Sequence, residues 1–149
     1  MEVNEALKLI DRLNNLSEIY GRIETAVCGL VHRYYTEVYE IEMIEAGIIT
    51  KSGFGGEQLA SLLDKKKDVH KRYWSNQSSF YTPCSAGNEP EHVWGTLTNI
   101  EVFQNGDDVE PLYFFNAKKL REDGSLGGSV AFLIRILDGE LFIEHEFFG

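Results

Sequence analysis

The sequence predicts an α+β fold, in which N-terminal helices pack on a curved antiparallel sheet of four to six strands. Three observations support this class. Residues 1–74 carry apolar side chains at helical intervals, residues from 92 onward are rich in β-branched and aromatic side chains, and Asp138-Gly139 separates the last two apolar runs. An Asp-Gly pair between two such runs is the strongest local signal for a β-hairpin.

The first helical pattern covers residues 2–20, where apolar side chains recur every three or four positions and polar side chains take the opposite side. The same spacing continues from Arg22 to Val38. Either Ser17 and Glu18 open a second helix, or Gly21 is a soft break in one long helix, and both readings stay open. The apolar positions are Val3, Leu7, Ile10, Leu13, Leu16 and Tyr20 before this glycine, and Ile23, Ala26, Val27, Leu30, Val31, Tyr34, Tyr35 and Val38 after it.

Residues 37–50 fit two structures. They continue the helix up to Gly47, a residue type that often ends helices, or they form a strand in which Val38 and Glu40 alternate with Tyr39 and Ile41. We favour the helix.

Residues 57–74 predict a further helix, with Leu59, Leu62 and Val69 among its inner positions. A basic patch follows its outer side, and we expect a solvated face there, since charge runs on helices usually are solvated. The alternative is a docking site for an acidic partner or an anionic ligand. The patch consists of Lys65, Lys66, Lys67, His70, Lys71 and Arg72.

Strands are predicted at residues 92–104, 109–119, 130–137 and 141–148, with a short one at 80–82. Asn105-Gly106 gives a second hairpin signal. The last strand alternates in part, which places one set of its side chains on one face and the remainder on the other. These sets are Leu141, Ile143, His145 and Phe147, and Phe142, Glu144, Glu146 and Phe148.

The chain of 149 residues fits one domain, mainly helical over 1–74 and mainly antiparallel strands over 78–149. A net charge of −10 argues against nucleic acid as a partner. No apolar run reaches the length of a membrane helix, and the N-terminus lacks the apolar core of a signal peptide, so we expect a cytoplasmic protein that does not bind membranes. Cys28 and Cys84 match no metal spacing, and we expect neither a metal nor a cofactor.

The second half resembles the cystatin-like cone fold of the nuclear transport factor 2-like superfamily, which includes ketosteroid isomerases, polyketide cyclases and small dehydratases. Residues 131–143 (AFLIRILDGELFI) resemble the long strand, Asp-Gly turn and apolar strand that end these proteins. The order of His92, Asn99 and Gly106-Asp107, and the Arg33-Tyr34 pair, are similar as well. The likeness covers about residues 22–148, although Leu141 stands where a tryptophan is common. It implies a pocket between the long helix and the sheet, and homodimerisation through the open sheet face.

In such a pocket, Tyr34, Tyr35 and His145 are the candidate catalytic residues. A buried tyrosine hydroxyl can donate to a developing oxyanion, and a histidine can move a proton near neutral pH. Each also has a structural reading: the tyrosines as core residues, and His145 as a hydrogen-bonded structural histidine.

Arg135, His92 and Trp94 are the candidate ligand-binding residues. Arg135 is the most informative, because an unpaired guanidinium within an apolar strand is costly and must reach solvent, a carboxylate or an anionic ligand. The carboxylates considered are Glu24, Glu37, Glu42 and Glu101.

These residues support two hypotheses. The first is a protein that binds a small apolar or anionic molecule, or a cofactor-free lyase or isomerase. The alternative is a non-enzymatic interaction protein, such as an acidic immunity-type inhibitor or the small subunit of an assembly, with aromatic anchors at Phe80-Tyr81 and Phe147-Phe148.

Overall fold

The computed structural model describes residues 3–53, 56–75, 89–106 and 110–148, with the backbone alone at 12–20 and 148. The four strands form one antiparallel sheet in the order β1-β2-β3-β4, with helices on one side, so the predicted α+β class is confirmed. The strand expected at 80–82 lies outside the described residues. The elements are α1 (Val3–Ser52), α2 (Glu57–Tyr73), the 3-10 helix η1 (Trp94–Thr96), β1 (Leu97–Asn105), β2 (Leu112–Leu120), β3 (Leu126–Leu137) and β4 (Glu140–Phe148).

Helix α1 is continuous over 50 residues and passes through Gly21 and Gly47 without ending. It stops at Ser52, where Gly53 adopts φ 75° and donates its N–H to the carbonyl of Ile49 at 2.9 Å. The helical reading of residues 37–50 is therefore confirmed, and the predicted end at Gly47 is wrong. A helix-ending glycine needs a left-handed backbone, and it is Gly53 that adopts one.

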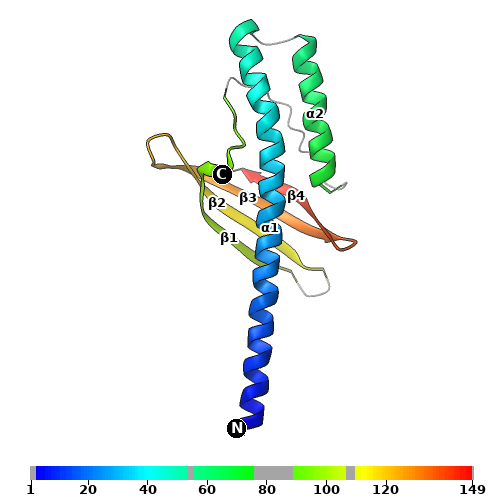
Figure 1. Ribbon diagram of the computed structural model, residues 1–149, viewed down its shortest axis with the longest axis vertical. Coiled ribbons are helices and arrows are strands. Elements are labelled where there is room, and N and C mark those ends of the chain that lie inside the picture. Colours follow the sequence, from blue (N-terminus) through cyan, green and yellow to red (C-terminus); the bar gives the residue numbers. More distant parts are fainter. Residues whose placement is uncertain (1–2, 54–55, 76–88, 107–109, 149) are drawn as a thin grey trace.

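The middle of α1 crosses one face of the sheet, and α2 runs back beside the C-terminal part of α1 (Figure 1). The core lies between these helices and the inner face of the sheet. The N-terminal part of α1, drawn in blue, extends beyond the sheet (Figure 1). The most buried core residues are Val27, Val31, Tyr34, Tyr35 and Val38 from α1, and Phe115, Phe132, Ile134 and Ile143 from the strands.

Strands β3 and β4 join through Asp138 and Gly139, both with positive φ (51° and 80°), which is the turn geometry expected of an Asp-Gly hairpin. Their pairing contains a β-bulge, because Leu133 pairs with His145 whereas Ile134 pairs with Ile143. The prediction that Ile143 and His145 share a face is therefore wrong. Ile143 faces the helices, and His145 lies on the opposite face.

Two strands begin later than predicted. Residues 94–96 form η1, so β1 starts at Leu97, and β2 starts at Leu112, directly after Pro111. Proline lacks the N–H that a ladder requires, which accounts for the second boundary.

Candidate functional site

Four of the six predicted site residues meet where α1 contacts the segment before β1. Tyr34 and Tyr35 are buried, and their ring centroids lie 5.7 and 5.0 Å from that of His92. Trp94 lies 6.2 Å from Tyr35, again edge to face. The arrangement is a packed aromatic cluster, in which edge-to-face contacts add to the stabilisation from burial.

Glu42 fixes His92 within this cluster. Its carboxylate accepts the backbone N–H groups of Glu91 and His92, both at 2.9 Å, and Nδ1 of His92 lies 3.1 Å from Oε1. Burial raises the pKa of Glu42, but the hydrogen bonds from His92 and the two backbone groups outweigh it, so the pKa lies below its ordinary value. When Nδ1 of the neutral ring donates to Glu42, Nε2 of His92 is left as an acceptor. Sequence reasoning named Glu42 only as a partner for Arg135.

A small pocket of about 210 Å³ opens beside this cluster, with Thr36, Tyr39, His92 and Trp94 in its wall. The space between α1 and the centre of the sheet is filled by side chains, since Tyr34, Phe115 and Phe132 are all fully buried there. The pocket thus lies at the edge of the helix-covered layer and has room for a group about the size of one aromatic ring.

Arg135 and His145 lie on the other face of the sheet. Nε of Arg135 donates to Glu144 at 2.6 Å, and this hydrogen bond raises the pKa of the guanidinium. Glu144 was not among the expected carboxylates, because the register that makes it a neighbour depends on the bulge. His145 is exposed, with its ring 4.6 Å from that of Phe147. The six predicted residues therefore do not form one site: His145 is separated by the sheet from both tyrosines.

An apolar row crosses all four strands on this open face, and we call it the aromatic row: Phe103, Phe114, Leu133 and Phe147. Phe103 pairs with Phe114, and Phe114 with Leu133. Ring centroids are 5.6 Å apart for Phe103 and Phe114 and 5.8 Å for Phe114 and Phe147. Phe103 and Phe147 keep 44% and 42% of their surface exposed, whereas both helices lie on the other face (Figure 1). From the sequence only Phe147 of this row could be identified as an exposed anchor, because the strand register that places the other three residues beside it is not a local property of the sequence.

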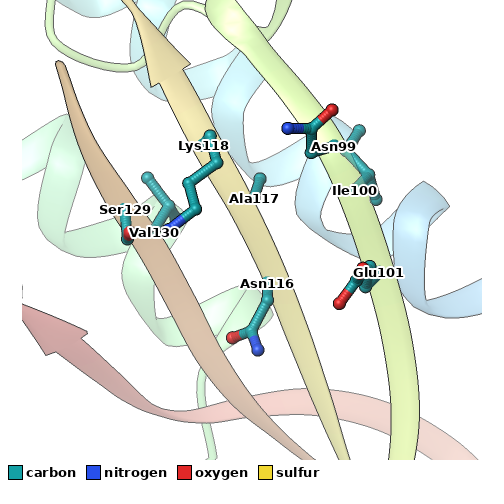
Figure 2. Close-up of a pocket in the computed structure, with 8 residues that line it drawn as sticks. All are labelled: Asn99, Ile100, Glu101, Asn116, Ala117, Lys118, Ser129 and Val130. Atoms are coloured by element: carbon teal, nitrogen blue, oxygen red, sulfur yellow. Dashed lines mark hydrogen bonds between the residues drawn. The ribbon is translucent and has the colours of Figure 1, made fainter. Parts of the chain in front are cut away.

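A polar hollow of about 510 Å³ adjoins the row on the same face (Figure 2). Lys118 donates to the hydroxyl of Ser129 at 3.0 Å, and Asn116 and Glu101 stand on the neighbouring strand positions. The register of β1 shifts between Thr98 and Glu101. The hollow presents side chains of both charge signs.

A buried ion pair joins the two helices. Lys66 of α2 contacts Glu45 of α1, and each side chain is only 2% exposed. The expectation of a fully solvated basic face on α2 is therefore wrong for Lys66. The spacing of Lys66 in the sequence indicated that it is buried, because Leu62, Lys66 and Val69 lie on the same inner side of the helix.

Comparison with known protein families, curated protein sequences and solved structures finds no match to this chain. The superfamily resemblance stays a prediction. Among the described residues, no three His, Cys, Asp or Glu side chains are grouped to hold a metal ion. Within the same part of the chain, no helix combines the length and apolar character needed to span a membrane.

Proposed function

We propose that the chain is a non-enzymatic interaction protein, a subunit that associates with a second copy through the aromatic row. The observation that carries this proposal is the exposure of Phe103 and Phe147 on the two edge strands, β1 and β4, on the sheet face that lies away from the helices. Exposed aromatic patches rimmed by polar residues are typical of protein interfaces.

The charges around the row favour a second copy as the occupant. Glu101 and Lys118 flank one side, Arg135 and Glu144 the other, so this face is locally balanced although the chain carries −10. Although Glu110 also acts on Arg135, a strongly basic partner would meet nearly as many cations as carboxylates here. A second copy related by a two-fold axis would instead place each acidic residue within reach of a basic one.

The exposed rings give the contact a useful strength. At the observed exposure, each phenylalanine offers roughly 80 Å² for burial, worth about 2 kcal/mol. Four such rings in the dimer supply about 8 kcal/mol against an association cost of about 4–15 kcal/mol. The rings alone therefore leave at most about 4 kcal/mol, which corresponds to a millimolar Kd, and with Phe114 and Leu133 adding further area we expect dimers at high micromolar concentration.

Sedimentation equilibrium tests the proposal. We expect Phe103→Gln and Phe147→Gln each to weaken dimerisation at least about tenfold, which corresponds to 1.4 kcal/mol. The matched control is Leu126→Gln, because Leu126 is 52% exposed on the same sheet but about 23 Å along β3 from the row, and it should change nothing. A monomer at every concentration, or equal effects from all three variants, would overturn the proposal.

A small-ligand function is the second candidate, and the pocket beside His92 favours it. An acceptor Nε2 among Thr36, Tyr39 and Trp94 suits a ring-sized donor such as a phenol. Titration with phenol and indole, followed by the NMR signals of the Trp94 indole, should give saturable shifts that Tyr39→Ala removes. Shifts that do not saturate, or that persist in Tyr39→Ala, would end this candidate.

A further inference from the structure

Residues 3–26 of α1 form an arm whose N-terminal part projects beyond the sheet (Figure 1). At its base Ile23 packs against the core, and Thr25 and Ala26 line a pocket with residues of α2 and β4. Val27 is the first buried residue among the α1 side chains that the structure describes. Four large apolar side chains of the arm are between 44% and 76% exposed. They are Val3, Leu7, Leu9 and Ile10.

The apolar spacing of the arm continues that of the core. In the sequence, positions separated alternately by four and three residues run through Leu9, Leu13, Leu16, Tyr20 and Ile23, and then Val27, Leu30 and Tyr34. The last three of these pack against the sheet, with exposures of 3% or less. This alternation is the heptad pattern of coiled coils. The apolar positions through which α1 packs against the sheet therefore continue along the arm, and we call this series of positions the seam.

An isolated helix takes little stability from intrinsic propensity, and most helices in proteins depend on packing of one apolar face. We propose that the arm packs against the arm of a second copy, as an antiparallel two-stranded coiled coil.

Charge selects a second copy as the occupant. The arm carries four acidic and three basic residues, a net charge of −1, whereas the whole chain carries −10. Two arms thus meet with little repulsion and with both signs available for pairing, and a strongly basic partner finds an excess of only one acidic side chain. The residues are Glu5, Asp11, Glu18 and Glu24, and Lys8, Arg12 and Arg22.

Charge also sets the direction of the pair. The acidic bodies of the two copies repel each other, and a parallel pair would hold them side by side. An antiparallel pair places them at opposite ends of an arm about 36 Å long, well beyond the screening length of about 8 Å in physiological salt.

This inference goes beyond the proposed function, because the arm is remote from the aromatic row and uses different residues. A chain with two separate two-fold contacts builds a closed tetramer or an open filament. Each contact can be removed while the other is kept, so the two proposals fail separately.

Small-angle X-ray scattering and sedimentation on the full chain test the arm. The experiment uses the double variant Phe103→Gln/Phe147→Gln, so that only the arm contact is measured. We expect a dimer with a longest dimension of about 110 Å, since two helices of about 75 Å overlap along their arms. Adding Leu9→Glu should abolish it. The matched control is Asn4→Glu, which adds the same charge to an exposed arm position outside the seam and should leave the dimer intact.

Three results would overturn the inference. One is a monomer at all concentrations in the double variant. Another is a compact dimer of about 75–80 Å, the length of a parallel pair. The third is a dimer that Leu9→Glu and Asn4→Glu weaken equally. Circular dichroism on each variant confirms that the fold is retained.

Discussion

Replacing Lys66 by methionine removes the cation from the buried pair with Glu45 and leaves that carboxylate in the interior. Because each side chain is 2% exposed, water cannot replace the lost partner. Breaking a buried ion pair by removing one member costs about 3–5 kcal/mol. Total stabilities are only about 5–15 kcal/mol, so Lys66→Met should lose a large part of the free energy of unfolding.

Urea unfolding at neutral pH, followed by circular dichroism, measures this loss. With a slope of about 1–3 kcal/mol/M, the midpoint should fall by roughly 2 M. The double variant Lys66→Met/Glu45→Leu removes both charges and should recover most of the stability, because apolar replacement of a buried pair is often neutral or stabilising. The matched control is Lys65→Met, an exposed neighbour on α2, which should shift the midpoint little. A loss below about 1 kcal/mol for Lys66→Met, or no recovery in the double variant, would refute this reasoning.

Three further predictions concern the helix, the Glu42 carboxylate and a thiol. Gly47→Ala should stabilise the fold by about 0.5–1 kcal/mol in urea unfolding, because Gly47 is exposed within α1 and a Cβ there meets nothing within 4 Å; a destabilised variant would contradict the continuous helix. Since the folded-state pKa of Glu42 lies below its unfolded value, its ionised form stabilises the fold above about pH 4, and this contribution is lost as pH falls through the folded-state pKa. Unfolding measured from neutral pH down to about pH 2 should therefore show that the free energy of unfolding falls less steeply on acidification in Glu42→Gln than in the unmodified protein. The same pH dependence in both proteins would count against the Glu42–His92 contact. Burial and the nearby Glu24 raise the pKa of Cys28, so mass spectrometry should find slow alkylation of Cys28 near pH 8 that Glu24→Gln accelerates; labelling as fast as that of an exposed thiol would refute this assignment.

The class and the main elements could be predicted from the sequence, because periodicity and turn chemistry are local properties. The Asp138-Gly139 hairpin is the clearest case, and α2 ends within one residue of its predicted boundary. The length of α1 could not be predicted as well. A glycine within a helix costs only about 1 kcal/mol, so the sequence around Gly21 and Gly47 did not decide whether the helix ended.

The arrangement of the site depended on tertiary register, which no local pattern contains. One extra residue at the β4 bulge moved His145 to the open face and away from the two tyrosines. The Arg135–Glu144 pair and the aromatic row follow from that same register. Lys66 was assigned to solvent because lysines are rarely buried, although its spacing matched the inner side of α2.

The central claim is that the aromatic row forms the contact between two copies, and hydroxyl-radical footprinting tests it directly. The oxidation rates of Phe103 and Phe147 are measured by mass spectrometry from low to high micromolar protein, with exposed Leu126 as the internal reference. We predict that both phenylalanines become protected as concentration rises, while the oxidation of Leu126 stays constant. Constant oxidation of the two phenylalanines across a range in which sedimentation detects a dimer would place that dimer elsewhere and contradict the claim.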